Sequence, residues 1–362
     1  MENPRVFFAL GLVGLCLSLS SCASTGGGGA TGAGSIDDTA RYLAGLPGGA
    51  RNDLALSRNS PEWKTHQSRM DRLWTVHSGR RSHIKKFRGE LGRLGSPGLL
   101  FYPFGGPDYL HAAELFPGAS NYILVGLEGV DPMPELTSLG TGDLNRGLAA
   151  TANTLRTVTE ASYFVTTEMR ADLQSSPLRG TLPILLAQIA RDGRTVQSVA
   201  AVGIDAGGRL TSRAAGAACP GWHIRAGGKN IYYFQEDLSN GGLGDRRILR
   251  FVSSKGDPVT FVKSASYLMH EGRFSTIRDY IVHSSRGLVQ CPSGVPYRYL
   301  KNTDWNLKLF GNYQGAQDPF TSYRQSDLIE AYATRAHPVR PMTFGIGYLY
   351  RPENTCLIVG QR

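Results

Sequence analysis

Three side chains that can transfer protons surround the first turn of the main domain. Asp108 and His111 lie three residues apart, where an expected helix begins, and Glu128 follows the next expected strand. A carboxylate beside a histidine can perform general acid–base catalysis. We therefore take Asp108, His111 and Glu128 as candidate catalytic residues for a hydrolysis or a group transfer. The simpler alternative is that Asp108 only caps the helix and that Glu128 lies on the surface.

Glycines in the same turn allow a ligand to approach the backbone. Gly105 and Gly106 precede Asp108, and Gly126 ends the next expected strand. Glycine has no Cβ, and the free N–H groups of a helix's first turn attract polar ligand atoms. In open α/β sheets, ligands bind outside the carboxyl ends of the strands. We expect Gly105, Gly106, Asp108 and Gly126 to bind a small molecule or a glycan.

The order strand, turn, helix, strand around these residues superficially resembles the first unit of a dinucleotide-binding or methyltransferase domain. In that comparison, Glu128 stands where such domains keep the acid that binds ribose. The turn departs from G-x-G-x-x-G, because Gly105 and Gly106 are followed by Pro107 and Asp108 and the third glycine is missing. Nicotinamide and S-adenosylmethionine are also not normally available outside the cytoplasm, which is where the N-terminal sequence described below would direct the protein. We therefore expect no cofactor.

Residues 102–112 read Tyr-Pro-Phe-Gly-Gly-Pro-Asp-Tyr-Leu-His-Ala. This segment resembles the pattern Tyr-Pro-Phe-x-Gly-Pro-Asp-x-Leu of an uncharacterised family of bacterial exported proteins. The resemblance covers this motif, increases the interest of Gly106 and Asp108, and implies no particular reaction.

The N-terminus has the features of an export signal that ends at a lipid-attachment site. An apolar run over residues 6–20 follows Arg5 and closes with Leu19-Ser20-Ser21-Cys22, which resembles the lipobox of bacterial lipoproteins. The resemblance implies cleavage before Cys22, a thioether-linked lipid and acylation of the new amino group, which together anchor a protein stably. Ala23 in place of Asp implies, by resemblance to Gram-negative lipoproteins, the outer membrane with the domain facing the periplasm. The alternative is an ordinary signal peptide.

The chain then divides into a signal peptide (1–21), a Gly-rich tether (22–35), a basic helical segment (36–95) and an α/β domain (96–362). The segment from Arg58 to Arg93 contains ten Lys and Arg residues and three Asp and Glu residues. Its net charge is therefore +7, out of +10 for the whole chain. Such a helix could contact anionic lipid headgroups or cell-wall polymers, or it could simply present a solvated face. No nucleic-acid-binding motif accompanies the charge, so we expect no nucleic acid as a partner.

The spacing of apolar residues predicts an α/β fold with a mixed, partly parallel sheet flanked by helices and preceded by an N-terminal helical segment. Expected helices are 36–47, 109–116, one marked by apolar residues over 144–158, 182–190, 275–283 and 322–333, with a longer one beginning at Ser60 and Pro61. Expected strands are 99–102, 122–125, 196–204, 231–234, 259–262, 288–289, 305–310, 344–350 and 356–359. A short connection separates the last two, so we expect them to pair antiparallel.

Several kinds of site are not expected. The sequence contains no G-x-S-x-G, no HExxH, no phosphate-binding P-loop and no C-x-x-C, and we expect no metal site. Cys219, Cys291 and Cys356 allow at most one disulfide, whose pair stays open. Three hypotheses remain: a lipoprotein that binds a small molecule or a glycan, an envelope hydrolase or transferase, and an assembly or scaffold protein that holds a partner.

Overall fold

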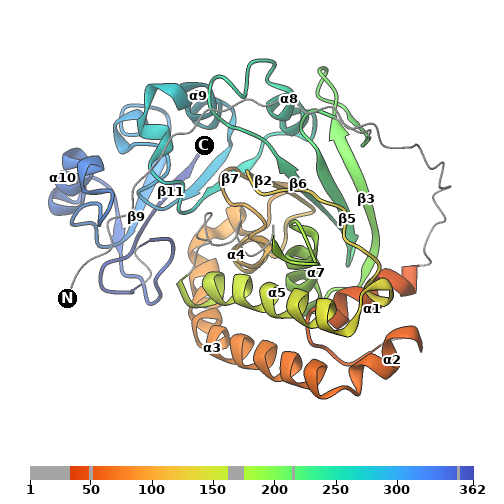
Figure 1. Ribbon diagram of the computed structural model, residues 1–362. Coiled ribbons are helices and arrows are strands. Elements are labelled where there is room, and N and C mark those ends of the chain that lie inside the picture. The colour runs from red at the N-terminus through yellow and green to blue at the C-terminus, as the bar shows by residue number, and fades with distance from the viewer. Residues whose placement is uncertain (1–32, 49–51, 162–174, 214–216, 349–350) are drawn as a thin grey trace. The chain divides into compact units, whose positions relative to one another are not determined.

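Figure 1 shows a computed structural model of the chain, which describes residues 33–48, 52–161, 175–213, 217–348 and 351–362. The expected signal peptide, Cys22 and most of the expected tether lie outside the described residues. An eleven-stranded mixed sheet carries helices on both faces. The predicted α/β class with a partly parallel sheet is confirmed. Residues Gly32–Arg362 form one compact unit, so the basic helical segment packs with the sheet.

The strands, in chain order, are β1 (Leu99–Tyr102), β2 (Asn121–Gly126), β3 (Val196–Ile204), β4 (Leu210–Ser212), β5 (Gly221–Ala226), β6 (Lys229–Gln235), β7 (Val259–Val262), β8 (Gly287–Gln290), β9 (Asn306–Gly311), β10 (Val339–Arg340) and β11 (Cys356–Gln361). Their order in the sheet is β10-β9-β11-β8-β7-β1-β2-β6-β5-β3-β4. The neighbours β8, β7, β1, β2 and β6 are parallel. β11 is antiparallel to both β8 and β9, and β5 is antiparallel to β6 and β3.

The order in which the chain adds parallel strands to the sheet reverses next to β1. The chain moves from β1 to β2 and β6 on one side, and then returns to β7 and β8 on the other side. This is the 3-2-1-4-5 order of doubly wound sheets, in which the crevice for a ligand opens outside the carboxyl ends of the strands at the point of reversal. We call the place where the carboxyl ends of β1 and β7 meet the switch point.

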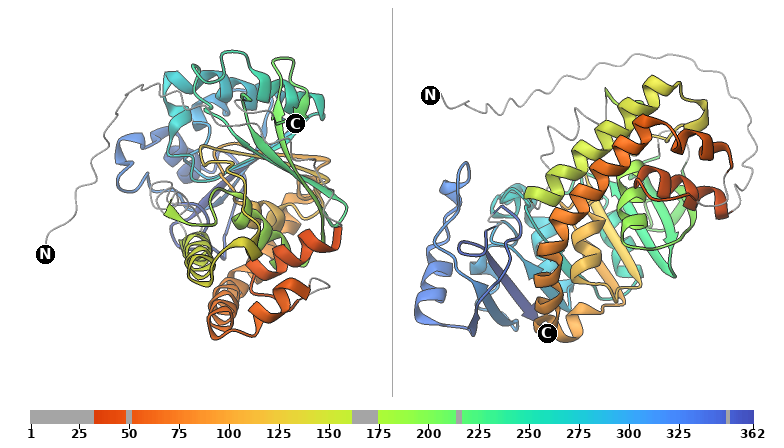
Figure 2. Two further views of the ribbon diagram at one scale, coloured as in Figure 1. Left: turned by 45° about the vertical axis from the view of Figure 1, so that its right-hand side comes forward. Right: turned by 90° about the horizontal axis from the view of Figure 1, so that it is seen from below.

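The helices are α1 (Ala33–Leu43), α2 (Asn52–Arg58), α3 (Pro61–Leu91), α4 (Tyr109–Leu115), α5 (Thr141–Ala161), α7 (Leu182–Arg191), α8 (Arg247–Ser254), α9 (Ser275–Ser284) and α10 (Ser326–Thr334). One hydrophobic core lies between the sheet and α1–α5 with α7, and a second lies between the opposite face and α8–α10. Figure 2 shows α3 and α5 side by side across the first of these faces.

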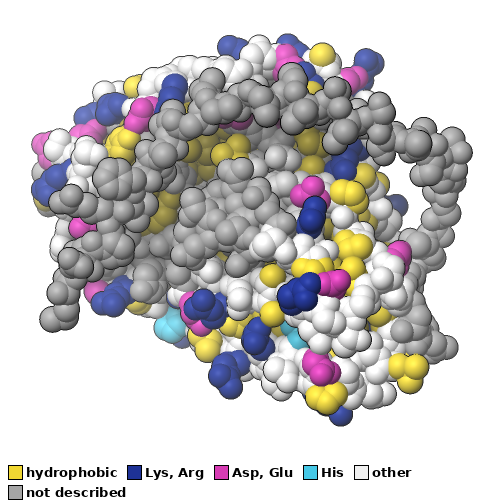
Figure 3. Space-filling view, in the orientation of Figure 1, with side chains coloured by type: hydrophobic (Ala, Val, Ile, Leu, Met, Phe, Trp, Pro, Cys, Tyr) yellow, Lys and Arg dark blue, Asp and Glu magenta, His cyan; other side chains and the backbone are white. Residues whose placement is uncertain are grey.

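The long helix α3 begins as its sequence predicts and buries one face. The Ser60 hydroxyl accepts the Trp63 N–H, and Pro61 occupies the first turn. Side chains at helical spacing, from Trp63 to Leu91, are buried against the sheet side. Exposed basic side chains occupy the other face: Lys64, Arg69, Arg72, Lys85 and Lys86. Figure 3 shows basic groups, with a few acidic ones among them, over this side of the molecule.

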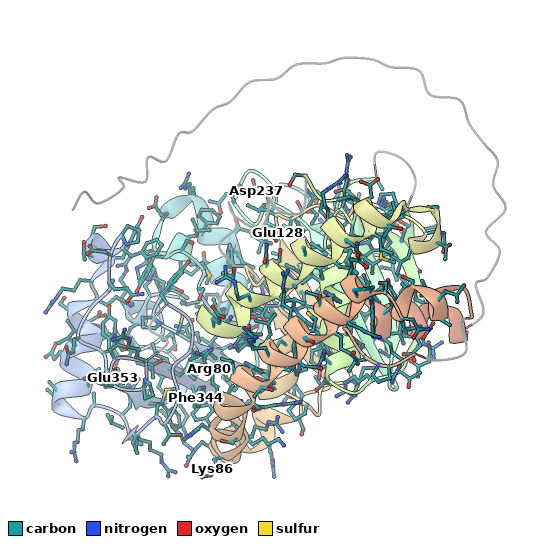
Figure 4. The ribbon with its side chains drawn as sticks, turned by 60° about the horizontal axis from the view of Figure 1, so that its bottom comes forward. Arg80, Lys86, Glu128, Asp237, Phe344 and Glu353 are labelled. Atoms are coloured by element: carbon teal, nitrogen blue, oxygen red, sulfur yellow. The ribbon has the colours of Figure 1, made fainter. Side chains whose placement is uncertain are left out.

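The predicted hairpin at the C-terminus is wrong. Residues 344–348 form bends and turns with a single bridge at Ile346, and residues 349–350 lie outside the described part. β11 is antiparallel, as expected, but its partners are β8 and β9. The apolar residues that precede β11 are buried by packing on α3 rather than by strand pairing, since the Phe344 ring lies 5.4 Å from that of Phe87. Figure 4 labels Phe344 and, on α3, Arg80 and Lys86.

Candidate ligand site at the carboxyl ends of the parallel strands

Asp108 lies at the switch point and joins β1, β7 and α4. It is the N-cap of α4, where its Oδ1 accepts the His111 N–H at 3.2 Å. The Tyr102 hydroxyl, at the end of β1, donates to Oδ2 at 3.0 Å. Lys263 directly follows β7 and places its Nζ 2.8 Å from Oδ2. One carboxylate therefore fixes the ends of two strands and the start of a helix.

His111 completes this cluster on the side of the helices. Its Nδ1 donates to Oδ1 of Asp108 at 3.0 Å and lies 3.4 Å from Nζ of Lys263. Asp108, His111 and Lys263 are only 1%, 0% and 2% exposed. The structure thus brings together Asp108 and His111, two of the three candidate catalytic residues, in the interior of the protein. We call Tyr102, Asp108, His111 and Lys263 the charged cluster.

The charged cluster holds an ion pair rather than two neutral groups. Burial alone would raise the pKa of Asp108, but Lys263 and His111 lower that pKa well below its usual value. Burial lowers the pKa of Lys263. Burial, together with Lys263, lowers the pKa of His111, so its imidazole is neutral at pH 7. With its Nδ1 engaged and its ring fully buried, His111 orients Asp108 rather than meeting a substrate.

Glu128 approaches the turn from the side of β2. The Tyr233 hydroxyl, on β6, lies 2.9 Å from its main-chain carbonyl and 3.2 Å from its Oε2. A Cβ on Gly106 would lie 3.0 Å from Oε2, and a Cβ on Gly126 would lie 2.6 Å from Cα of Gly106. The Gly106 N–H donates to the Val125 carbonyl at 3.1 Å. These two expected ligand-binding glycines therefore let the turn pack tightly against β2.

Gly105, the remaining expected ligand-binding residue, packs on the end of β1. A Cβ there would lie 2.6 Å from the ring of Tyr102. The turn from Gly105 to Asp108 is therefore closed against the protein on this side. The switch-point crevice, where a doubly wound domain binds its dinucleotide, is occupied by Tyr102, Asp108 and Lys263. These residues do not fit such a cofactor.

Two loops at this edge contain residues other than glycine with positive φ. Phe104 follows β1 with a φ of 63°, and Ser264, Ser266 and Tyr267 follow β7 with φ of 55°, 48° and 56°. Each such residue costs about 1–2 kcal/mol, and strain of this kind clusters at functional sites. The Tyr348 hydroxyl holds the second loop, since it donates to the Ser264 carbonyl at 2.9 Å and accepts the Ser266 N–H at 3.2 Å.

A small pocket opens beside the second loop. Its lining residues are Tyr267, Cys291, Pro292, Ser293, Ile346 and Tyr348. It has room for about one water molecule. Cys291 directly follows β8, and its Sγ accepts the Ser264 N–H at 3.3 Å. Because Ser264 directly follows Lys263, its contact with Cys291 places the pocket next to the charged cluster. Burial raises the pKa of Tyr102, and Asp108, Cys291 and Tyr348 raise it further.

Sequence reasoning did not find Lys263, Cys291 or Tyr348. Lys263 and Cys291 nevertheless carry a signal, because each is a chemically distinctive residue directly after an apolar strand, at the carboxyl edge where ligands bind. Tyr348 carries no such signal, because it lies in the irregular segment before β11.

Part of the basic charge of α3 acts inside the protein. His77 places its Nε2 2.8 Å from Oε1 of Glu114 on α4, and Nε of Arg81 lies 3.1 Å from the same oxygen. Both His77 and Glu114 are almost fully buried. The His77 ring lies 6.0 Å from that of His111, so the contacts of Glu114 adjoin the charged cluster. The exposed part of the basic charge is correspondingly smaller than the count in the sequence.

Three further properties bear on the site. No group of three metal-ligating side chains occurs within the described ranges. Cys219, Cys291 and Cys356 are buried free thiols, so the structure contains no disulfide among these three. Within the described part of the chain, no helix combines the length and the apolar character that a membrane span requires.

Replacing Lys263 tests the ion pair. Lys263→Met leaves an ionised Asp108 buried without its cation, which should lower the free energy of unfolding by about 3–5 kcal/mol. The double variant Asp108→Asn with Lys263→Met should recover part of that loss. Lys301→Met is the control, because Lys301 is 37% exposed and lies 3.4 Å from Asp327, and it should cost less than about 1 kcal/mol. Urea unfolding measures all three, and equal losses for Lys263→Met and Lys301→Met would contradict the prediction.

Comparison with known proteins adds no relative. No family model matches the chain, and neither a curated protein nor a solved structure matches it.

Proposed function

We propose that this protein is a lipid-anchored protein of the bacterial envelope whose α/β domain binds a small molecule or a glycan without transforming it. The ligand binds at the Gly105–Asp108 turn, and the pocket at the carboxyl ends of β7 and β8, which now has room for about one water molecule, must widen to admit it. The position of that pocket carries the proposal, because it adjoins the switch point of a parallel sheet. The left-handed residues Ser264, Ser266 and Tyr267 support it, since their strain shapes this wall.

A hydrolase or transferase that uses Asp108, His111 and Glu128 is the second candidate. The Asp108–His111 hydrogen bond at 3.0 Å favours it. Against it, all three side chains are buried, and Lys263 already holds the Asp108 carboxylate. Glu128 lies on the β2 side of the turn, against Tyr233. Binding agrees better with this geometry than acid–base catalysis does.

The anchor and the exposed basic face of α3 support the proposed location. The lipobox resemblance at Cys22 implies attachment to the outer membrane with the domain facing the periplasm. Exposed Lys and Arg on α3 would be attracted to anionic headgroups or cell-wall polymers close to that anchor. The same face supports the third possibility, an assembly or scaffold role, in which a partner would dock on α3.

Native mass spectrometry tests ligand binding. Protein purified under gentle conditions should carry an additional non-covalent mass. Ile346→Phe fills the pocket from its lining and should remove that mass, whereas Ile329→Phe on α10 adds the same ring to the other core and should retain it. If the wild type carries no ligand, or if Ile346→Phe retains it, the binding proposal fails.

Membrane fractionation tests the anchor. Cys22→Ser should release the protein into the soluble fraction after a high-salt wash, which screens the attraction of the basic face. Cys219→Ser replaces a buried thiol of the folded domain and should leave the protein on the membrane. A Cys22→Ser variant that stays as firmly bound as the wild type would show that the lipobox assignment is wrong.

A further inference from the structure

The outer side of α3 presents positive charge that the rest of the protein leaves uncompensated. We call its five exposed cations the basic face: Lys64, Arg69, Arg72, Lys85 and Lys86. Within the described part of the chain, none of the five takes part in an ion pair. Cations on long side chains without a counter-ion stay available to an anionic partner.

The acidic residues of α3 do little to offset this charge. The Asp71 carboxylate accepts a hydrogen bond from Arg191, at the end of α7, at 2.8 Å. The Glu90 carboxylate accepts one from Arg340, on β10, at 2.6 Å. Cations from other elements therefore neutralise both acids. The third, Glu62, lies in the first turn, where the positive end of the helix dipole compensates part of its charge.

The cations of the basic face extend along the helix rather than around one point. With about 100° per residue, Lys64, Arg72 and Lys86 fall within an arc of about 80° on the helix surface. The first and the last of them are about 33 Å apart at 1.5 Å per residue. Gly79 and Ser82, which lie between Arg72 and Lys86, are exposed and short. A long, level row of charge suits an extended anionic surface better than a single small anion.

Exposed apolar side chains accompany the cations. Leu56 on α2 is 84% exposed and Val76 on α3 is 57% exposed, and they are two of the three large apolar side chains that stand out among the described residues. Val76 lies one helical turn after Arg72. Figures 1 and 2 show α2 and α3 along the same side of the molecule, and Figure 3 shows apolar groups among the basic ones there. A membrane surface accepts both kinds of side chain, because its headgroups border hydrocarbon.

The expected anchor keeps this side of the protein within reach of a membrane. Cys22 stands eleven residues before Ala33, where α1 begins, and eleven residues span at most about 38 Å. The far end of α1 contacts the start of α3, since Nε2 of His66 lies 2.9 Å from the Leu43 carbonyl. Because α1 itself is only about 16 Å long, the tether is long enough for α3 to touch the membrane. A short tether also raises the effective concentration of the surface that it holds nearby.

We propose that the basic face of α3 lies flat on a membrane surface that contains anionic phospholipids, with Leu56 and Val76 among the lipid headgroups. The lysines and arginines meet the lipid phosphates, and α8, on the opposite face of the sheet, points away from the membrane. The inference rests on the proposed lipid anchor and names the partner of α3.

Fluorescence quenching by lipid headgroups tests this orientation. The full-length protein is reconstituted in vesicles of phosphatidylcholine, alone or mixed with phosphatidylglycerol, and both contain a quencher linked to a headgroup. A fluorophore on Ser82→Cys should be quenched more strongly with phosphatidylglycerol, and high salt should remove the difference. A fluorophore on Ser253→Cys, an exposed serine of α8, should show no difference. Protein without an added cysteine gives the background, and Cys219, Cys291 and Cys356 are buried.

Two triple variants with the same change in charge test the role of the basic face. The first combines Lys64→Glu, Arg72→Glu and Lys86→Glu. The second changes exposed cations elsewhere and combines Arg225→Glu, Lys255→Glu and Lys301→Glu. Only the first should reduce the quenching to its value in phosphatidylcholine, because three cations near an anionic surface together strengthen binding roughly a hundredfold.

A variant without a change in charge tests the apolar contact. Leu56→Ser combined with Val76→Ser should reduce the quenching in part, because it removes the apolar groups that enter the headgroup region. Unchanged quenching in this variant would overturn the assignment of Leu56 and Val76 to the membrane.

The outcomes separate this inference from the proposed anchor. If phosphatidylglycerol does not increase the quenching, or if both triple variants reduce it equally, the inference is overturned. Binding of soluble polyglutamate to the same cations, without an approach to the vesicles, would instead assign the basic face to an anionic polymer. If the protein does not float with phosphatidylcholine vesicles, the anchor proposal fails, and the phosphatidylglycerol vesicles still test α3.

Discussion

The buried ion pair between Lys263 and Asp108 is the interaction on which the carboxyl edge of the sheet depends. Taking two charges out of water costs several kcal/mol per ion, and only close geometry with further hydrogen bonds compensates for it. Here the Asp108 carboxylate accepts from Tyr102 and His111 as well as from Lys263. These residues come from β1, α4 and the end of β7. The ion pair therefore links the strands on one side of the switch point to the strands on the other side.

This constraint restricts the proposed ligand site to the pocket beside the glycine turn. The charged cluster fills the crevice at the switch point, and Gly106 packs the turn against Glu128 and β2. What stays open is the neighbouring pocket, whose wall is the strained loop after β7. Lys263 begins that loop, and Tyr348 holds it by two hydrogen bonds. The loop beside the pocket is therefore anchored at its first residue by the ion pair. The charged cluster therefore supports the loop that borders the pocket.

Local sequence patterns predicted the strands and the helix cap around the site. Contacts between distant parts of the chain determine which residues meet there, and local patterns do not encode them. The apolar runs at 99–102 and 259–262 and the cap at Asp108 depend on neighbouring residues, and the structure has them. The pairing of Asp108 with Lys263 depends on β7 returning beside β1, which no local pattern encodes. β5 was missed because glycine, histidine and arginine interrupt its apolar residues, although both of its edges are paired. The alternation at 344–350 was mistaken for a strand because burial against α3 also hides alternate side chains.

The ionisation of Asp108 is the most direct measure of this account. Carbon-13 NMR of its carboxyl carbon, assigned with Asp108→Asn, follows its charge as the pH is lowered while the protein stays folded. We expect the resonance to stay at its ionised position down to about pH 3, below the ordinary aspartate pKa of about 3.9, because Lys263 and His111 lower the pKa of Asp108. A titration with its midpoint at or above the ordinary value would show that Asp108 is not held as an anion, and would contradict the account.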